Sequence, residues 1–372
     1  MGRRVLITGL DTFWGGRMAQ ALEAEPEVEM ILGLGTNDPK VPLDRTEFVR
    51  ADQKYSIVSR IVAASQVDTI VHTFLETNSA RVPAPVLHEI NVIGTLNLLA
   101  AAGGSASSVR QVVIKSSTHV YGAAERDPVW FREEDQRTGP VRTRLERSLI
   151  EVESIVRDFA DDNPQLTVSV LRFANVLGTD IVTPISHDLR QRVLPSIVGF
   201  DPLIQFVEED DVVRALEHVT ANRLAGVYNV AGSGKLPWSE VASICNAYLL
   251  PLPPFRPRLF LEPLTRVGLL QFPSETEGLA RYGRGVDTSR LVETGFEYRY
   301  TSAGAVESFA RANNLRRTIG RSEPEYRYER EVEQFFRHSP AVVRAPPDGF
   351  RGNGVGGDGN GGGGVGGRFA DS

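Results

Sequence analysis

Residues 5–16 read VLITGLDTFWGG, and the fold can be argued outward from this stretch. VLIT is an apolar run that predicts a buried strand, and FWGGRMAQALEAE, which begins at Phe13, repeats its apolar residues at helical spacing. The glycines between them predict a tight turn that opens onto a helix N-terminus. Free N–H groups and the positive end of the helix dipole favour a dinucleotide pyrophosphate there, although a tight turn without a ligand remains an alternative.

Strands and helices alternate from this turn to about residue 180. The further apolar runs read VEMILGLG, EFVRAD, VDTIVHTF, VRQVVIKSS and LTVSVLRFANVLG, with helical patterns such as IVSRIVAASQ and PVLHEINVIGTLNLLAAAG between them. Strands that are almost wholly apolar and alternate with helices predict a parallel sheet covered on both faces. We therefore predict an α/β protein whose residues 1–180 form a Rossmann-type doubly wound parallel sheet.

The pattern loosens after this point and predicts a smaller C-terminal substrate lobe at 181–320. DDVVRALEHVT and PWSEVASICNAYLL predict helices, VYNVAG predicts a strand, and the prolines of PLPPFRPRLFLEPL break any long element. The charged segment 321–344 predicts a helical extension. The glycine-rich segment 345–372 has little apolar surface to bury and predicts a disordered tail.

Composition narrows the class of protein. A net charge of −6 argues against nucleic-acid binding, which needs a basic face. The single cysteine, Cys245, excludes an internal disulfide and any multi-cysteine metal site, and we expect no metal. No run of about 18 apolar residues is present, and the chain enters its first strand at once. We expect a cytoplasmic protein that binds neither membrane nor nucleic acid.

The glycine turn departs from the usual spacing. Glycines at positions 9, 12 and 15 would complete the pattern, but position 12 is Thr12. Its side chain could displace a cofactor, or its hydroxyl could bond a phosphate. An acidic residue at the end of the second strand would hold the ribose, yet Gly35 stands there, and Asp38 is the nearest alternative.

Several segments together resemble the extended short-chain dehydrogenase/reductase family, the nucleotide-sugar epimerases and dehydratases. The resemblance covers about residues 3–315. It rests on VLITG, VRADQ, VDTIVHTF, NVIGTLNLLAAA, VVIKSSTHVYG, LRFANVLG, FVEEDDVVRAL, GVYNVAGSG and VDTSRLVETGFEYRYT, in this order. It implies binding of NAD or NADP and of a nucleotide-sugar-like small molecule.

The resemblance also implies positions for the site. The cofactor would contact Gly9, Thr12, Phe13, Gly15, Asp52, Gln53, Thr73, Phe74, Asn91 and Ser116, of which Asn91 matches a structural asparagine of the family. The substrate would contact Ser117, Thr118 and Asn175. Ser117 matches the serine that orients the sugar hydroxyl, although it could instead cap its own backbone.

The acid/base couple of the family is missing. Its members use a tyrosine and a lysine one helical turn apart, because an isolated phenol of pKa about 10 is a poor base at neutral pH. Aligning RSLIEVE (147–153) on that motif places Leu145 and Leu149 at the two positions. No tyrosine lies between Tyr121 and Tyr228, and no lysine lies between Lys115 and Lys235, so a shift of the alignment does not restore the couple.

Substitute groups are scarce. Tyr121 and His119 follow Ser117 closely and could handle the proton, although packing and an exposed loop are their ordinary roles. Lys115 lies within a strand, and we expect it not to face the nicotinamide. His187 could approach from the second lobe, but no pattern places it.

Three hypotheses follow. The protein could be an enzyme that uses a substitute proton group, a non-catalytic sensor or scaffold that binds a nucleotide or nucleotide sugar, or a structural subunit that has lost cofactor binding. The family often forms dimers through the helices at 83–103 and 141–160. The apolar stripe of Leu145 and Leu149 is compatible with such a homodimer and equally with a core face of the helix.

Overall fold

The structure is a computed structural model that describes residues 2–51, 55–77 and 82–319. Contacts divide the chain into one compact unit, Met1–Thr318, and a second unit, Ile319–Ser372. The helical extension predicted at 321–344 and the tail predicted at 345–372 lie outside the described residues.

Seven parallel strands form the central sheet, in the order β11-β6-β5-β4-β1-β2-β3. They are β1 (Arg3–Thr8), β2 (Val28–Gly35), β3 (Thr46–Arg50), β4 (Thr69–His72), β5 (Gln111–Ser117), β6 (Thr167–Phe173) and β11 (Gly226–Val230). The predicted α/β class and doubly wound sheet are confirmed. Since parallel strands need crossover connections, the helices between them cover both faces.

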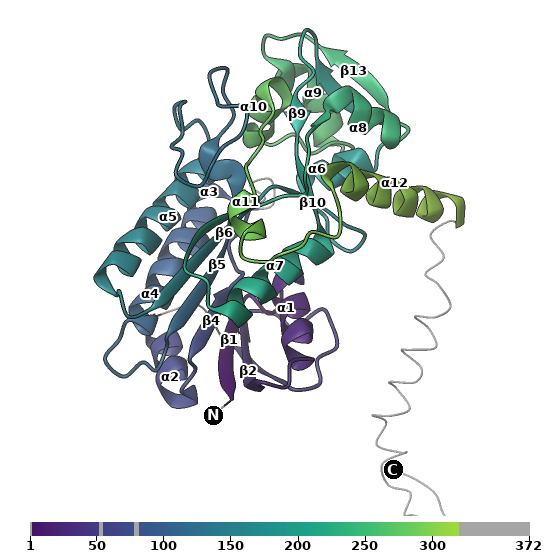
Figure 1. Cartoon of the computed structure of the whole chain (residues 1–372). Coiled ribbons are helices and arrows are strands. Elements are labelled where there is room, and N and C mark those ends of the chain that lie inside the picture. The colour runs from purple at the N-terminus through teal and green to yellow at the C-terminus, as the bar shows by residue number, and fades with distance from the viewer. Residues whose placement is uncertain (1, 52–54, 78–81, 320–372) are drawn as a thin grey trace, which may run out of the picture. The chain divides into compact units, whose positions relative to one another are not determined.

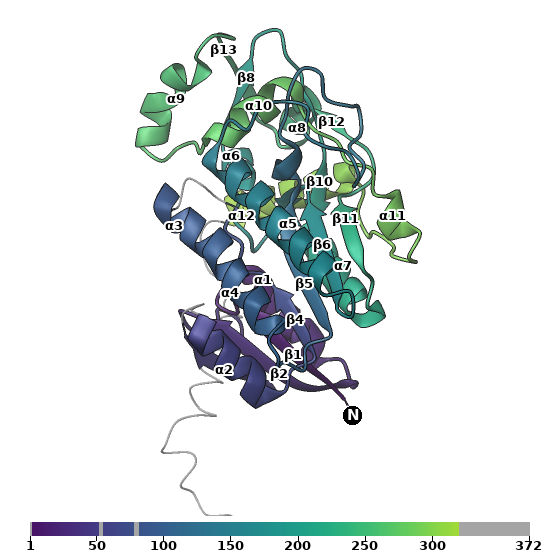
Figure 2. The same ribbon diagram turned by 90° about the vertical axis from the view of Figure 1, so that its left-hand side faces the viewer.

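Two helical layers flank the sheet (Figure 1). The helices α1 (Phe13–Glu23) and α7 (Glu209–Asn222) contact each other on one face. On the other face lie α2 (Tyr55–Ser65), α3 (Ala84–His88), the π-helix η1 (Glu89–Ile93), α4 (Gly94–Ala102) and α5 (Arg144–Asp162). Figure 2 shows α4 and α5 side by side along the sheet.

The strand order reverses between β1 and β4. In open α/β sheets, ligands bind outside the carboxyl ends of the strands at such a switch point. The glycine turn follows β1, and the segment from Thr73 follows β4, so both border this edge. The serine at 117 ends β5, the next strand along, and therefore lies at the same edge.

The chain leaves the sheet after β6 and later returns to it. Its remaining strand pairs are β7 (Asn175–Leu177) with β10 (Phe206–Glu208), β8 (Val193–Ile197) with β13 (Tyr248–Leu252), and β9 (Leu203–Ile204) with β12 (Leu236–Pro237). Its remaining helices are the 3₁₀ helix η2 (Thr118–Tyr121), α6 (Pro184–Leu189), α8 (Trp238–Ile244), α9 (Pro257–Arg266), α10 (Ser274–Tyr282), α11 (Ser289–Val292) and α12 (Ser302–Ile319). Because α7 covers the sheet and β11 extends it, residues 181–320 supply both the smaller lobe and part of the sheet layer.

Two predictions about local structure in the lobe were wrong. The helix predicted over PWSEVASICNAYLL ends at Ile244, and the residues from Tyr248 instead pair with β8. Asn246, with a φ of 52°, turns the chain between these two elements. The proline-rich segment contains α9, since Pro257 occupies the first turn, where no N–H is needed; Pro263 lies inside the helix.

One helical stretch among the described residues, Pro85–Ala102, is long and apolar enough by composition to cross a membrane. Half of this stretch is buried inside the fold, and a helix in the core of a protein outside the membrane passes the same test. The stretch is therefore weak evidence for a membrane span.

Candidate functional site

The glycine turn has the predicted conformation. Gly9 has a φ of 76°, and a Cβ on Gly15 would collide with the Gly9 carbonyl oxygen, so α1 can approach β1 only with glycine at that position. Thr12 caps α1: its hydroxyl donates to the Gly9 carbonyl at 2.7 Å and accepts from the Gly15 N–H at 3.2 Å. That hydroxyl is therefore used inside the turn, which leaves the N–H groups of Phe13 and Trp14 to meet a phosphate.

Two glycines in β2 accommodate the side chains of the turn. A Cβ on Gly33 would collide with Leu10, and a Cβ on Gly35 would lie 2.8 Å from the Asp11 Oδ1 atom. Asp11 is only 7% exposed; its Oδ2 accepts from the Asn37 N–H at 3.0 Å, while its Oδ1 is buried without a hydrogen-bond partner. A carboxylate thus lies beside the residue where the sequence pattern looks for an acid.

The residues after β4 connect the elements of this edge. The Thr73 hydroxyl donates to the Thr8 carbonyl at 2.8 Å, and Phe74 contacts Gly9. Asn91 is fully buried; its Oδ1 accepts from the Glu76 N–H at 2.8 Å, and its Nδ2 donates to the Glu76 carbonyl at 2.9 Å. Its amide is committed to this loop, so the predicted cofactor contact of Asn91 is replaced by a structural role. Asp52 and Gln53 lie outside the described residues.

Ser116 and Tyr121 belong to a buried polar network on the α5 side of the sheet. The Ser116 hydroxyl donates to Glu153 at 2.6 Å, and Glu153 forms a salt bridge with Arg172 at 2.5 Å. Arg172 also donates to the Tyr121 hydroxyl at 2.6 Å. Every group in this network has a partner, which is the condition for stability of buried charges.

Tyr121 is consequently a poor substitute base. Burial raises its pKa to about 12, and Arg172 only partly offsets that rise. Its ring stacks on Phe131 with the centroids 4.5 Å apart, and it is 2% exposed. These contacts argue against the predicted catalytic role of Tyr121, and the hydroxyl of Ser116 is occupied by Glu153; both roles stay predictions.

Ser117 lies on the other side of β5 and is held by a histidine. Its hydroxyl is 2.7 Å from the Nδ1 atom of His119, and the imidazole tautomer decides which of the two donates. It also accepts from the His119 N–H at 3.3 Å, so the capping role weighed for this serine is present as well. Burial, and then the charge of Arg284, holds the pKa of His119 well below its usual range. The imidazole is therefore neutral at neutral pH.

Arg284 is a site residue that the sequence did not reveal. It is 8% exposed and donates through one terminal nitrogen to the Gly122 carbonyl at 3.0 Å, while its other terminal nitrogen is buried without a hydrogen-bond partner among the described residues. Burial lowers its pKa to about 10. An unsatisfied buried guanidinium next to His119 is suited to an anionic ligand group. No sequence pattern joins residues 119 and 284, because only the tertiary fold brings them together.

Lys115 is a second such residue. It is 4% exposed, and its ammonium lies 5.0 Å from the ring centroid of Trp14 and 5.6 Å from that of Phe173. Burial lowers its pKa to about 8, and the carboxylate of Glu76 opposes that shift. We expected this strand residue not to face the site. Side chains alternate along β5, however, so Lys115 leaves the sheet on the same face as Ser117.

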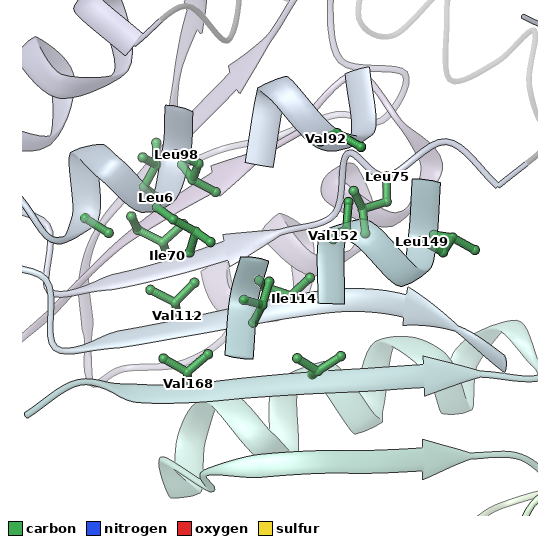
Figure 3. Close-up of a cluster of buried hydrophobic side chains, with 14 of the residues drawn as sticks. Leu6, Ile70, Leu75, Val92, Leu98, Val112, Ile114, Leu149, Val152 and Val168 are labelled. Carbon is green, nitrogen blue, oxygen red and sulfur yellow. The ribbon is translucent and has the colours of Figure 1, made fainter. Parts of the chain in front are cut away.

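The two positions that the sequence alignment assigned to the tyrosine and lysine are core positions. Leu145 and Leu149 are both 0% exposed and belong to the hydrophobic cluster between α5 and the sheet. Figure 3 shows Leu149 and Val152 of α5 near Leu75 and Val92. The apolar stripe therefore fills the chain's own core, and it is not available to the dimer face considered from the sequence.

The lobe side of the site is formed by β7 and its neighbours. Thr118 is buried, and Asn175 is half-buried with its Nδ2 donating to the Gln205 carbonyl at 3.0 Å. Gln205 also borders a cavity of about 660 Å³. The cavity is lined by Val129, Trp130, Arg132, Asp135, Gln205, Ser233, Gly234, Val286, Asp287 and Thr288. None of the predicted site residues lines it.

Two further expectations about the site concern His187 and metal binding. His187 lies in α6 next to Asp188, with its Nδ1 3.2 Å from a carboxylate oxygen, and no contact joins it to Ser117. Among the residues that the structure describes, no group of three or more histidine, cysteine, aspartate or glutamate side chains could hold a metal ion.

A parallel sheet with a glycine turn at its switch point, and a serine at the end of the neighbouring strand, defines the class of Rossmann-type α/β proteins. Within this class, the family model described as the NAD dependent epimerase/dehydratase family matches residues 5–231. The chain belongs to this family, and the resemblance seen in its sequence is confirmed.

Known proteins agree with this assignment. The uncharacterized protein Rv0501 of Mycobacterium tuberculosis (strain ATCC 25618 / H37Rv) is 30% identical over 318 residues, 84% of each chain. The UDP-glucose 4-epimerase of Pasteurella multocida is 26% identical over 186 residues, 47% of this chain and 53% of the epimerase. The dTDP-glucose 4,6-dehydratase DesIV of Streptomyces venezuelae, solved with NAD and TYD bound, has a TM-score of 0.63 at 22% identity and matches 85% of this chain and 98% of its own. At that identity the likeness is one of fold.

Proposed function

We propose that this chain binds NAD at the glycine turn and acts on a nucleotide sugar at the edge of the sheet, with its proton chemistry rebuilt. The observation that carries this proposal is Ser117, which lies buried at the carboxyl end of β5 with its hydroxyl held by a neutral histidine. The family is NAD-dependent by its description, and DesIV has NAD at its own site.

The residues at the turn fit the cofactor. Gly9 and Gly15 keep α1 close to β1, and the N–H groups of Phe13 and Trp14 would meet the pyrophosphate. The unpartnered Oδ1 of Asp11 would accept a ribose hydroxyl, and its negative charge would repel the extra phosphate of NADP. NAD, when bound, supplies the capacity to accept and return a hydride.

The substrate would be oriented from three sides. Ser117 would hold the reacting sugar hydroxyl, with His119 fixing the serine hydroxyl in place. The unpaired nitrogen of Arg284 would bind a phosphate oxygen of the nucleotide. Asn175 and Thr118 complete the predicted substrate contacts. A UDP- or dTDP-sugar matches this chemistry, and proteins named for such substrates are among the relatives and structural neighbours.

A second candidate is a non-catalytic protein that binds the same nucleotides as a sensor. The observation in its favour is the complete burial of Leu145 and Leu149, which leaves no place for a phenol on α5.

Titration and turnover separate the two candidates. Calorimetric titration with NAD and NADP measures cofactor binding, and incubation with NAD and a panel of UDP- and dTDP-sugars measures conversion. Binding of NAD with sugar conversion supports the enzyme, whereas binding without any conversion over the whole panel supports the sensor. Absence of NAD binding would refute both. Gly15→Ala is the matched negative control for the turn.

We also propose a cytoplasmic protein that forms a homodimer through the outer face of α3, η1 and α4. Val86, Ile93 and Leu96 on these helices are 39–47% exposed. An Ile93→Glu variant should be monomeric in sedimentation equilibrium at a concentration where the unchanged chain dimerises. If the variant and the unchanged chain have the same mass in this experiment, the proposed dimer face is contradicted.

A further inference from the structure

The ammonium of Lys115 is buried beside two aromatic rings. Its surroundings are the rings of Trp14 and Phe173, and no hydrogen bond or salt bridge to it exists among the described residues. A buried ammonium without a partner is strongly disfavoured, since burial removes its hydration. Two cation–π contacts at 5.0 and 5.6 Å return only part of that loss.

On the opposite side of β5, a buried charge with a structural role is surrounded by hydrogen-bond partners. There, Arg172 is bonded to Glu153, and Ser116 and Tyr121 complete the hydrogen bonds. Lys115 has no comparable set of partners. A methionine or leucine would fill the same space between the two rings at lower cost, so packing does not explain a lysine at this position.

The position of the amine matches the chemistry that the helix α5 has lost. Lys115 and Ser117 are two residues apart on one strand, so their side chains leave the sheet on the same face, opposite to Ser116. Both reach Phe173: the ammonium lies over its ring, and the Ser117 hydroxyl is 3.5 Å from its carbonyl oxygen. Trp14 brings the start of α1 to the same point.

We propose that Lys115 is the catalytic residue that takes up and returns the proton of the sugar hydroxyl oriented by Ser117, in place of the missing couple. This inference rests on the proposed function. In the oxidative direction the neutral amine accepts the proton: the O–H bond breaks, an N–H bond forms, and the oxygen electron pair forms the carbonyl as the carbon loses a hydride. NAD, when bound, would supply the oxidant that accepts this hydride, and in the reverse direction the ammonium would return the proton.

The charges around Lys115 are few. Glu76, in the segment after β4, is the charged group that acts on it, while Trp14 of α1 and Phe173 of β6 are apolar. His72 on the adjacent strand bonds Thr8 and Thr95, and burial lowers its pKa to about 4, so it stays neutral. With a pKa of about 8, Lys115 can hold or release a proton near neutral pH, as a general acid or base must.

Turnover by two variants separates proton transfer from simple attraction. Lys115→Met removes the amine, and Lys115→Arg keeps the positive charge but cannot release a proton at ordinary pH. With NAD and the sugar that the panel identifies, both variants should lose roughly 10²- to 10⁴-fold in kcat with little change in KM. Lys40→Met, at an exposed position, is the control and should not change kcat. Full activity of Lys115→Arg would overturn the proposal, because it would show that charge alone is needed.

Chemical labelling tests the amine independently of turnover. The chain has only four lysines, at positions 40, 54, 115 and 235, so each can be followed by mass spectrometry. Acetic anhydride should acetylate Lys115 with a midpoint near pH 8. NAD with UDP-glucose or dTDP-glucose should protect Lys115 and not Lys40.

The outcomes distinguish the two proposals. If the unchanged chain and Lys115→Met convert a sugar equally well, the proposed role of Lys115 is overturned and the proposed function is left intact. The role of Lys115 is also overturned if the chain converts a sugar but NAD and the sugar nucleotide do not change the acetylation of Lys115. An unchanged chain that binds NAD and converts no sugar would overturn the catalytic function and with it the proton transfer.

Discussion

Replacing Lys115 by methionine should make the protein more stable. Burial lowers the pKa of this lysine from 10.5 to about 8, and each pKa unit corresponds to about 1.4 kcal/mol of differential stability. The charged form therefore costs about 3 kcal/mol at pH 7 relative to an amine that stays in water. Losing the two cation–π contacts removes about 0.5–1 kcal/mol each, so Lys115→Met should raise the free energy of unfolding by roughly 1–2 kcal/mol.

The sign of the pH dependence follows from proton binding. Between pH 8 and 10.5 the unfolded chain holds the proton of Lys115 and the folded chain does not, so stability of the unchanged protein rises with pH in this window. Below pH 8 both states are protonated, and the full destabilisation is present. The advantage of Lys115→Met should consequently be largest at pH 7 and shrink towards pH 10.

Urea denaturation of the two proteins at pH 7 and pH 10, followed by tryptophan fluorescence and circular dichroism, measures this difference. Taking the difference between variants cancels the titration of other groups. Lys40→Met is the control and should match the unchanged chain at both pH values, because Lys40 is exposed. A Lys115→Met protein that is less stable than the unchanged chain, by the same amount at both pH values, would refute the reasoning. It would show that the ammonium is stabilised by contacts stronger than the two rings provide.

The remaining predictions concern the core, the buried network and the turn. Leu149→Ala should lower the free energy of unfolding by about 2–5 kcal/mol, since the side chain is 0% exposed. Arg147→Ala, on the exposed side of α5, is the control and should change it by under about 0.5 kcal/mol. Equal effects of the two variants in urea denaturation would contradict the core position of Leu149. Glu153→Gln should cost about 3–5 kcal/mol in the same assay because it leaves Arg172 buried and unpaired, and a neutral result would show that water reaches the network. Gly15→Ala should abolish NAD binding in calorimetry, since a Cβ would collide with the neighbouring turn, and unchanged affinity would exclude the turn as the cofactor site.

The sequence predicted the sheet well because its signals are local. Most strands from β1 to β6 contain a short apolar run, and the pattern of one run does not depend on the others. The prediction failed at Tyr248, where a strand pairs with a segment about fifty residues earlier in the chain. An apolar run of that length reads equally as helix or strand, and only the partner decides.

The site was predicted less completely, for a related reason. Ser117 was predicted because the stretch VVIKSSTHVYG, which carries the resemblance, is local in the sequence. Asp11 and Arg284 were missed because what singles them out is a buried polar atom without a hydrogen-bond partner among the described residues, and burial is a tertiary property. Lys115 was considered, but it was expected not to face the nicotinamide. Gly35 was taken as a defect, although it makes room for the Asp11 carboxylate.

The buried leucines and the buried lysine are best understood together. With Leu145 and Leu149 in place, α5 contributes roughly 1.5–3 kcal/mol per leucine through burial, and its face is closed to any polar group. A proton-handling side chain at this edge must then come from another element. Strand β5 is the nearest alternative, because its alternating side chains place Lys115 on the same face as Ser117, the residue proposed to hold the sugar hydroxyl. A lysine two residues before that serine is destabilising by about 3 kcal/mol. The apolar packing of α5 is large enough to offset that cost, so the fold tolerates the buried amine next to the hydroxyl that is proposed to orient the sugar.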